Sequence, residues 1–512
     1  MGKMTTDVLI IGGGVTARRA AAIVSERYSV ILAEDGAGAS PYIHGLNVPL
    51  LEDDSKELFL ADTLESGKYQ NNRALAKALT DGSIDVIGEF KDEFDKNDDG
   101  SFNLLKPLGS SLPRVAGICG RTGAKILHDL RKNAKYTDLS NTRVLKLIKS
   151  GESVVGAQVF DKKAEKFFPI YAKAVLIACG GFGGIFPFST NSRDIGGDGI
   201  AAAYEAGAEL VDMEFIQYEP TVAIYPEEIA GKSIITTMLF EGAVIRNKDG
   251  ERFMDEKVGK DLLSVGICRE ILRGGATERG GVYFDMTAVP EDMLLGKYHD
   301  YFDRYFRVGI DIRKTPVEII PAPHTTMGGI KIDEHCRTTV NGLFAAGEAS
   351  GGLHGANRLG GNAGLEVLVF GDIAGRSILD YLDKKPYVQE APESGDGEIA
   401  DVPWDSAKLR AELHRICKDA LGVIKNGDAL KKAAGEIENI ISSASEHLDS
   451  FGGIRLYNDA VTIKLVIFSA LLRRESIGGH IRADSTPESG EKYCIVLKND
   501  NGTLTERRDI LK

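Results

Sequence analysis

The chain is poor in features that mark several large classes of protein. Its 512 residues include one tryptophan and six cysteines, and the cysteines never form a CxxC pair. They are Cys119, Cys179, Cys268, Cys336, Cys417 and Cys494. This spacing argues against a disulfide framework and against a zinc or iron–sulfur site held by this chain, so we expect no metal. Spare reduced thiols suit a reducing compartment.

Long apolar runs and an excess of positive charge are also lacking. No apolar run approaches 18 residues, and the first residues show no basic segment followed by an apolar one. We therefore expect neither a membrane span nor a signal peptide. Lys and Arg total 62 against 75 Asp and Glu, for a formal net charge of −13, which argues against a nucleic-acid binder. The expectation is a cytoplasmic protein.

Glycine, by contrast, is abundant, with 59 residues against an ordinary share of about 7%. The glycines gather in short runs, which is typical of backbone that passes close to a ligand. A chain of this length is expected to form two to four domains.

The first 35 residues predict a dinucleotide-binding βαβ unit. An apolar strand leads into the letters GGGVTA at 12–17, which fit G-x-G-x-x-A, and an alanine-rich helix follows. In this motif Gly12 makes the tight turn, Gly14 lets a pyrophosphate approach the backbone, and Ala17 packs the helix against the strand. Glu34 ends the second strand, twenty residues beyond Gly14, where a carboxylate can accept hydrogen bonds from a ribose.

Two later apolar strands, at 174–178 and 343–346, also run into glycine-rich segments. Three such units predict that the chain passes through one sheet three times and approaches the same cofactor each time. Between them, residues 221–335 have mixed periodicity and are interpreted as an inserted domain. A polar Gly- and Pro-rich linker at 391–397 marks a further boundary, and helical periodicity follows from about 406 to 474.

Two motifs carry a resemblance to a known family. HGANRLGGN at 354–362 resembles the signature loop of the fumarate reductase, succinate dehydrogenase and L-aspartate oxidase flavoproteins. HTTMGG at 324–329 resembles the same family's H-x-x-M-G-G element. Shorter matches follow in family order, namely RTG at 121–123, GGDG at 196–199, GERFM at 250–254 and RRES at 473–476.

The resemblance implies an α/β fold with a doubly wound FAD-binding domain, an inserted α+β capping domain and a C-terminal helical domain. The expected boundaries are 1–220 and 336–390 for the FAD-binding domain, 221–335 for the capping domain, and 400–512 for the helical domain and tail. The implied cofactor is FAD rather than NAD. Its expected contacts are Gly12, Gly14, Ala17, Glu34, Arg121, Thr122, Gly123, Ala178, Gly180, Gly181, Asp198, Gly347, Glu348, Asn362 and Ala363.

The mode of FAD attachment follows from one family position. Succinate dehydrogenases tether FAD through the histidine of an S-H-T sequence after the second strand. That position falls here at Pro41 or Tyr42, and His44 comes two or three places late. The resemblance therefore favours FAD that is bound without a covalent link.

The family's reaction moves a hydride between flavin N5 and a carbon next to a carboxylate. Arg358, in the signature loop, would supply a planar bidentate donor for that carboxylate. His324 and His354 would add hydrogen bonds, although a hydrogen-bonded core histidine is the plainer alternative for each. The candidates for moving the second proton are Glu219, His324 and His354.

The sequence departs from the family in the other half of the substrate site. Glu219 stands where fumarate reductases have a carboxylate-binding histidine, and Leu239 occupies the position of an arginine that donates a proton. The letters SVG at 264–266 replace a family S-R-D element. An unpaired Glu219 would repel a second carboxylate by about 1–4 kcal/mol. We therefore expect a substrate with one carboxylate and a polar or cationic end near Glu219, unless Glu219 turns away to pair with a basic residue such as Arg246.

Three other functions stay open at this point. The first is an ordinary succinate, fumarate or L-aspartate enzyme in which Arg246 or Arg269 fills the vacant arginine place. The second is a flavin subunit that exchanges electrons with a separate iron–sulfur or quinone-linked protein. The third is a flavin-binding protein that has lost catalysis.

Overall fold

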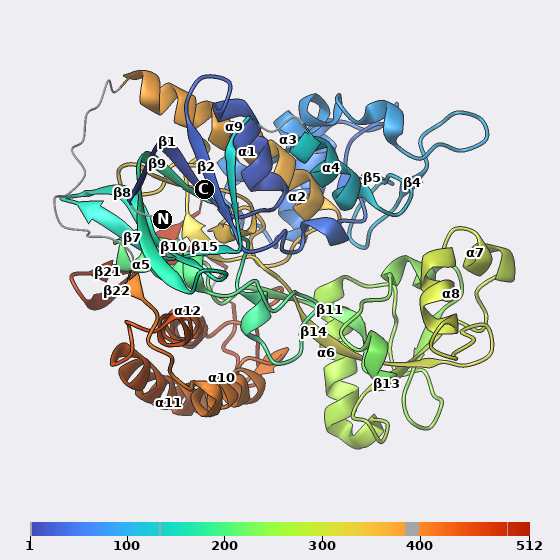
Figure 1. The fold of residues 1–512 in the computed structure, drawn as a ribbon. Helices are drawn as coiled ribbons and strands as arrows, with labels where there is room; N and C mark the ends of the chain where they lie inside the picture. The colour runs from blue at the N-terminus through green and yellow to red at the C-terminus, as the bar shows by residue number, and fades with distance from the viewer. Residues whose placement is uncertain (1–2, 133–134, 385–398, 489, 512) are drawn as a thin grey trace.

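The computed structural model describes residues 3–132, 135–384, 399–488 and 490–511. Figure 1 shows an upper body built around twisted sheets, a separate lobe formed by the middle of the chain, and a bundle of helices beneath the body. The linker expected at 391–397 lies outside the described residues.

An eight-stranded sheet forms the centre of the body. Its strands are β1 (Met4–Ile11), β2 (Val30–Glu34), β6 (Thr137–Ser140), β7 (Thr142–Ser150), β8 (Ser153–Asp161), β9 (Lys166–Ile177), β16 (Leu343–Ala345) and β18 (Ile399–Ala400). The strand β1 lies between β2 and β9 and runs parallel to both, and β16 runs parallel to β9. The carboxyl ends of these strands therefore meet at one edge, and the three predicted glycine-rich segments lie together there.

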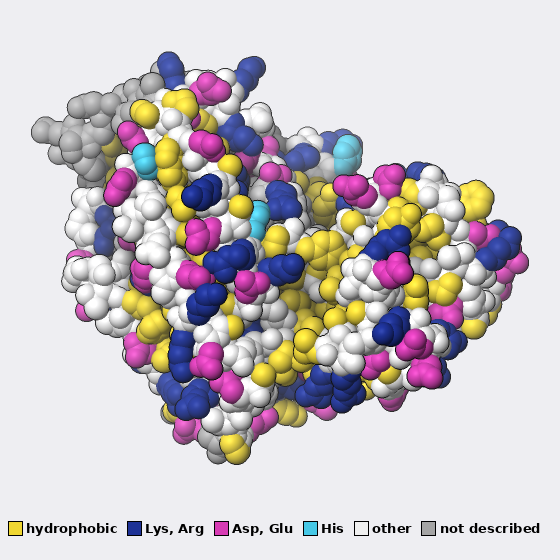
Figure 2. All heavy atoms as spheres, turned by 90° about the horizontal axis from the view of Figure 1, so that it is seen from below, with side chains coloured by type: hydrophobic (Ala, Val, Ile, Leu, Met, Phe, Trp, Pro, Cys, Tyr) yellow, Lys and Arg dark blue, Asp and Glu magenta, His cyan; other side chains and the backbone are white. Residues whose placement is uncertain are grey.

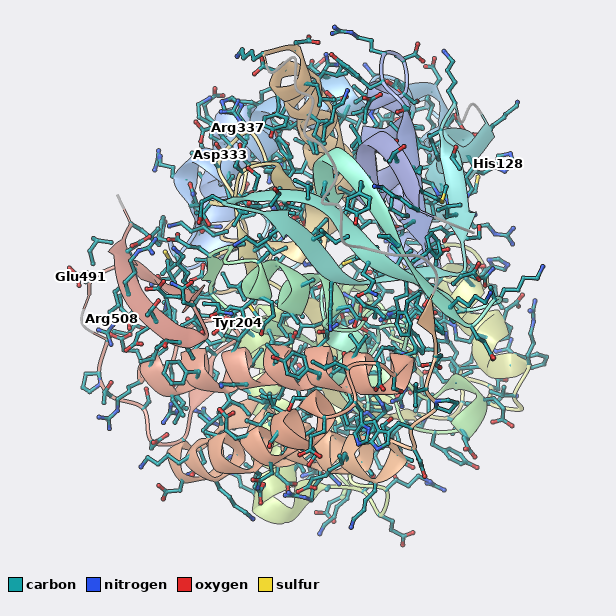
Figure 3. The ribbon with its side chains drawn as sticks, turned by 60° about the vertical axis from the view of Figure 1, so that its left-hand side comes forward. His128, Tyr204, Asp333, Arg337, Glu491 and Arg508 are labelled. Carbon is teal, nitrogen blue, oxygen red and sulfur yellow. The ribbon has the colours of Figure 1, made fainter. Side chains whose placement is uncertain are left out.

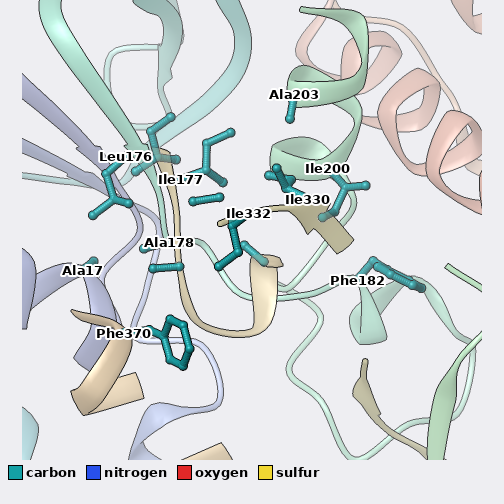
Figure 4. Close-up of a cluster of buried hydrophobic side chains, with 14 of the residues drawn as sticks. Ala17, Leu176, Ile177, Ala178, Phe182, Ile200, Ala203, Ile330, Ile332 and Phe370 are labelled. Carbon is teal, nitrogen blue, oxygen red and sulfur yellow. The ribbon is translucent and has the colours of Figure 1, made fainter. Parts of the chain in front are cut away.

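The apolar strand at the start of the chain is buried on both faces, as its continuous run of hydrophobic residues predicts. Leu9 and Ile10 are fully buried. Figure 4 shows Ala17 of α1 (Val15–Val24) and Phe370 of α9 (Asn362–Lys384) on one side of Leu176 in β9, and Ile200 of α5 (Asp198–Glu205) on the other. Helices on both faces of a parallel sheet confirm the predicted α/β, doubly wound class.

Smaller elements complete the body. They are α2 (Lys56–Ser66), α3 (Arg73–Ile87), α4 (Thr122–Lys132), β3 (Leu46–Asn47), β4 (Leu104–Leu105) and β5 (Val115–Ala116).

The middle of the chain forms the capping lobe, with a hydrophobic core of its own. Two antiparallel strands, β11 (Ile216–Ala223) and β14 (Val317–Thr326), run from the body into this lobe. The remaining elements are β12 (Val244–Arg246), β13 (Val282–Asp285), α6 (Lys260–Glu270), α7 (Glu291–Leu295) and α8 (His299–Phe306). The two connecting strands bring residues of the capping lobe to the edge where the body's glycine-rich segments meet.

The C-terminal region is helical at first and then returns to the body as strands. Its helices are α10 (Ala407–Ala420), α11 (Gly427–Ser445) and α12 (Phe451–Leu472). The hairpin β21 (Tyr493–Asp500) and β22 (Thr503–Ile510) then joins a five-stranded sheet with β10 (Leu210–Val211), β15 (Gly329–Lys331) and β17 (Ser350–Gly351), and a short pair, β19 (Ile424–Lys425) and β20 (Ile481–Arg482), lies nearby. Figure 3 shows Arg508 on the outer edge of this sheet. No helix within the described ranges is long and apolar enough to cross a membrane.

Helix α12 is anchored to the glycine-rich turn that precedes α5. The Asp459 carboxylate is buried, accepts a hydrogen bond from the Gly197 backbone N–H at 2.9 Å, and pairs with Arg410 at 2.8 Å. The neighbouring Asn458 amide donates to Asp198 at 2.9 Å. The helical region therefore holds one of the segments expected to contact the cofactor.

Replacing Asp459 tests this anchor. In Asp459→Ala the Gly197 N–H loses its acceptor and Arg410 its counter-charge, so we expect the unfolding free energy to fall by about 2–4 kcal/mol. The measurement is the urea midpoint of the purified protein. The matched control is Asp419→Ala, which removes a half-exposed carboxylate paired with Arg415 at 3.3 Å and should change stability by less than about 0.5 kcal/mol. Equal effects in the two variants would contradict the anchoring role.

Candidate active site

A groove of about 1070 Å³ runs along the carboxyl edge of the large sheet. Its walls include the turn after β1, the loop after β2 and the segment after β9, together with Glu348 and Glu366. This is the crevice in which doubly wound sheets bind ligands.

The turn after β1 fits a pyrophosphate. Gly12 has φ of +124°, and a Cβ there would lie 2.3 Å from the Ala178 carbonyl oxygen, so no side chain can replace it. A Cβ on Gly14 would lie 2.8 Å from Ser40 Oγ, which itself accepts a hydrogen bond from Val15 N–H at 3.0 Å. Gly14 caps α1 without a side-chain hydrogen bond, so backbone N–H groups of the first turn remain available to a phosphate. The residues present therefore fit a dinucleotide such as FAD.

About half of the predicted cofactor residues line this groove. They are Gly12, Gly14, Ala178, Gly180, Asp198, Glu348 and Ala363. The remaining residues do not line it, namely Ala17, Glu34, Arg121, Thr122, Gly123, Gly181, Gly347 and Asn362.

Glu34 lies under the groove, with its carboxylate already engaged by the protein. It accepts hydrogen bonds from the Gly36 N–H and the Ser140 hydroxyl, both at 2.9 Å, and lies 3.8 Å from Arg18. The next residue, Asp35, lines the groove. A carboxylate can accept further hydrogen bonds, so the contact of Glu34 with a ribose stays a prediction.

The segment 121–123 braces the loop after β2 from behind. The Thr122 hydroxyl donates to the His44 carbonyl oxygen at 2.5 Å, and the Gly123 N–H donates to the Ile43 carbonyl at 2.9 Å. A Cβ on Gly123 would lie 1.9 Å from the Ser40 carbonyl oxygen, so this close contact requires glycine. The segment thus holds in place the loop that lines both the groove and the cavity beside it.

A second cavity, of about 1440 Å³, continues from the groove and lies between the body and the capping lobe. Glu348 and Ala363 line both spaces, so a long cofactor can extend from one into the other. The first turn of α9 contributes Ala363 and Gly364 to the wall, and its N-terminal dipole favours negative charge there. Seen from below, hydrophobic side chains gather where the two lobes meet (Figure 2).

Glu348 is a buried carboxyl group in the wall shared by the two spaces. It accepts hydrogen bonds from the Thr326 N–H at 3.0 Å and from the Thr326 hydroxyl at 3.3 Å. Burial raises the pKa of Glu348 to about 7. Its charge at neutral pH is therefore partial.

Arg358 contributes a buried cation to the second cavity. Its side chain is about 7% exposed, and it has no ion pair within the described part of the chain. One terminal nitrogen donates a long hydrogen bond of 3.4 Å to the Leu359 carbonyl, and Nε has no partner. Burial lowers the pKa of this guanidinium, although arginine stays charged at ordinary pH. A guanidinium in this setting is poised to bind an anion.

Facing this cation, Glu219 of β11 and Lys260 of α6 form an ion pair. Lys260 Nζ lies 2.5 Å from Glu219 Oε2, and the Thr221 hydroxyl donates to Oε1 at 3.3 Å. His324 of β14 lies alongside, with Nε2 3.8 Å from the same carboxylate and Nδ1 2.8 Å from the Thr190 hydroxyl. Burial, together with the charges of Lys260 and Arg358, holds the pKa of His324 well below its usual value, so its ring is neutral.

His354 does not line either space. Its Nε2 lies 3.0 Å from Glu366 Oε2, and its Nδ1 has no hydrogen-bond partner among the described residues. Glu366 itself lines the groove. The structure therefore brings together Arg358, His324 and Glu219 of the four candidate catalytic residues, and places His354 behind them.

Two expectations about charge need correction. Glu219 pairs with Lys260 and not with Arg246, whose guanidinium binds Asp285 at 2.8 Å. The negative charge of Glu219 is therefore already balanced by Lys260, which weakens the expected repulsion of a second carboxylate. Leu239 is 2% exposed in the core of the capping lobe and does not line the cavity, so its position carries no role there.

Lys260 is the residue that our sequence analysis missed. The basic–acidic pair Lys260-Asp261, four residues before Ser264, is the available signal, because it keeps the charge order of the family's Arg-Asp element. Lys260 lines the cavity, whereas Ser264 and Val265 do not. Neither Arg246 nor Arg269 lines it.

Comparison with known proteins agrees with this geometry. Residues 7–363 match the FAD binding domain family. The chain is 36% identical to a FAD-dependent oxidoreductase of Methanocaldococcus jannaschii, over 97% of this chain and 96% of that protein. It is 32% identical to a subunit of the fumarate reductase (CoM/CoB) of Methanothermobacter marburgensis, over 96% and 97% of the two chains.

Among solved structures, Mycobacterium smegmatis Sdh1 superposes with a TM-score of 0.86 at 26% identity, covering 100% of this chain and 95% of that one. The α/β fold, the groove for a dinucleotide and the matches along nearly the whole chain lead to one assignment. The chain belongs to the FAD-dependent oxidoreductases of the fumarate reductase, succinate dehydrogenase and L-aspartate oxidase family.

Proposed function

We propose that the chain moves a hydride between flavin N5 of FAD and a carbon of a small carboxylate substrate. The observation that carries this proposal is the guanidinium of Arg358, which lines the second cavity with no counter-ion in the described residues. A buried arginine without a partner is costly, and a planar carboxylate satisfies two of its N–H groups at once.

The chain's residues hold and orient the reactants. Bound FAD would supply the hydride donor or acceptor. The glycine turn after β1 would hold its pyrophosphate, and the start of α9 would lie at its flavin end. Arg358 orients the substrate carboxylate. The capping lobe contributes Lys260 and Tyr301 to the wall opposite the body, and covering the cavity in this way excludes water from the reacting atoms.

The charges in the cavity favour a substrate with a single negative charge. Arg358 contributes one positive charge, the Glu219–Lys260 pair contributes none in sum, His324 is neutral, and Glu348 adds a partial negative charge. The site therefore balances at most one carboxylate, and the other end of the substrate meets an ion pair that suits a polar or ammonium group.

We also infer that FAD is held without a covalent bond. Ser40 is fixed under the pyrophosphate turn, and the two residues after it are Pro41 and Tyr42, which cannot form a histidyl link. His44 lines the second cavity, where its ring lies 6.4 Å from that of Tyr301 in the capping lobe.

Acid precipitation tests the absence of a covalent link. Because hydrogen bonds and packing alone would hold the cofactor, unfolding should release all of the FAD into the supernatant and leave a colourless pellet. The measurement is flavin absorbance in the two fractions. A yellow pellet that carries a flavin peptide containing His44 would contradict the proposal.

Anaerobic stopped-flow tests the proposed reaction. The flavin is reduced and then mixed with crotonate, acrylate, fumarate or iminoaspartate, while flavin absorbance is followed. We expect rapid reoxidation by a monocarboxylic enoate in the wild type and at least a 100-fold loss in Arg358→Met, which should still retain FAD. Arg246→Met, which removes an arginine of the capping lobe outside the cavity, is the matched control and should react normally. If no compound of the panel reoxidises the flavin, the proposal is overturned.

Glu219→Gln tests the charge balance. Without the carboxylate, Lys260 is free to bind a second carboxylate, so we expect dicarboxylates such as succinate to bind at least 10-fold more tightly, with little change for monocarboxylates. The measurement is the dissociation constant from flavin difference spectra. The control is Glu241→Gln, which breaks a similar pair with Lys297 outside the cavity. Unchanged succinate binding in Glu219→Gln would count against the charge argument.

A second candidate is a dicarboxylate enzyme in the strict sense, acting on fumarate, succinate or L-aspartate. Lys260 favours it, because a lysine that swings away from Glu219 gives the cavity a second cation. The names of the relatives point the same way. Reoxidation by fumarate alone in the stopped-flow panel would select this candidate.

A separate electron-transfer protein remains a further proposal. The Methanothermobacter marburgensis relative is named as one subunit of its fumarate reductase (CoM/CoB), and it matches this chain over nearly its whole length. Copurification of an iron–sulfur protein with the native chain would support such a partner.

A further inference from the structure

We propose that Lys260 is the catalytic acid–base residue, which exchanges the second proton with the substrate. This inference rests on the proposed function, because it names the residue that completes the hydride transfer described above. It differs from the expectation drawn from the sequence, which considered Glu219, His324 and His354 for this step.

The fold places Lys260 at the point where the capping lobe meets the cavity. It is the first residue of α6 and follows Gly259, whose φ of −58° and ψ of 155° turn the chain into the helix. Its side chain is about 19% exposed and lines the same cavity as Arg358 and His324. The ammonium group thus reaches from the capping lobe toward the space in which a substrate bound to Arg358 must lie.

Three other titratable groups of the cavity are poorly suited to donate a proton. His324 is neutral because its pKa lies well below the usual value, and its Nδ1 is engaged with Thr190. Burial also lowers the pKa of His44, and burial raises that of Tyr301 far above neutrality. In the proposed function Arg358 holds the substrate carboxylate, which leaves Lys260 as the other cation among the residues that line the cavity.

The surroundings of Glu219 and His354 argue against either residue as the proton donor. Glu219 is 3% exposed, and its carboxylate is already engaged by the Lys260 ammonium. His354 does not line the cavity and faces Glu366. Lys260 carries protons on Nζ and is free to rotate its terminal group toward a ligand.

The proposed step balances in atoms and electrons. In the reducing direction a hydride from reduced flavin adds to one carbon of the substrate C=C bond, and the π electron pair moves to the carbon beside it. That carbon forms a C–H bond with a proton from Lys260 Nζ, whose N–H bond breaks and leaves a neutral amine. The substrate gains two electrons and two hydrogens, and the flavin is oxidised. Solvent then returns the proton to Nζ.

Glu219 acts as a positioning residue for this step. Its carboxylate lies 2.5 Å from Nζ and holds the long lysine side chain in one place. Removing the carboxylate should therefore leave an active lysine that is less well positioned.

The test uses FAD-loaded protein and the panel compound that the wild type reduces fastest. In Lys260→Ala we expect the limiting rate of flavin reoxidation to fall at least 100-fold, with a change of less than about fivefold in the dissociation constant. Added ethylamine should restore part of that rate, because a free ammonium can enter the vacated space and donate the proton. Ethylamine rescue is a readout that a purely structural role of Lys260 would not produce.

Glu219→Gln and Lys297→Met complete the design. In Glu219→Gln the limiting rate should fall by less than in Lys260→Ala, because the lysine is kept but its side chain is no longer held in one place. Lys297→Met removes another ion-paired lysine of the capping lobe, 3.0 Å from Glu241 and outside the cavity, and should react like the wild type.

Each result decides between the alternatives. If Lys260→Ala keeps the wild-type limiting rate, or if affinity falls while the limiting rate does not, the acid–base assignment is overturned and the proposed function stands. A slow Lys260→Ala variant that ethylamine does not rescue also overturns it. If no panel compound reoxidises the wild type, the proposed function fails and the assignment fails with it.

Discussion

The buried guanidinium of Arg358 is the constraint on which the rest of the site depends. A charge that has left water needs a partner, and the described residues provide none for it beyond a long hydrogen bond to a carbonyl. The Arg358 carbonyl oxygen accepts a hydrogen bond of 2.8 Å from the Gln217 amide, which fixes the signature loop to β11. The loop is therefore held in place while its cation is left for an anion, and this combination gives the cavity its preference for a carboxylate.

The opposite wall is assembled from parts of the chain that are far apart in sequence. Glu219 and His324 lie on the two strands that connect the body to the capping lobe. Glu219 is paired with Ala322 across these strands, two residues before His324. Lys260 comes from the first helix of the lobe. The electrostatic balance of the site thus depends on the packing of α6 against β11, which holds Lys260 beside Glu219.

The sequence predicted local features better than long-range ones. The glycine turn at 12–17 could be predicted because strand, turn and helix are adjacent and each has a steric reason for its residues. The motif matches likewise predicted the fold class and the family, both of which are confirmed. The pair of Lys260 and Glu219 could not be predicted, since it joins residues 41 positions apart through the docking of α6 on β11. The positions of Glu34 and His354 depend in the same way on side-chain partners from other elements, and the domain boundaries and individual site roles stay predictions.

The most direct measurement is a crystal structure of the FAD-bound protein with crotonate, a small enoate that carries one carboxylate. The account predicts both carboxylate oxygens at hydrogen-bonding distance, about 2.7–3.2 Å, from the guanidinium of Arg358, with the C=C bond directed toward Lys260. A carboxylate bound to Lys260 instead, with the guanidinium of Arg358 still without an anion, would contradict it.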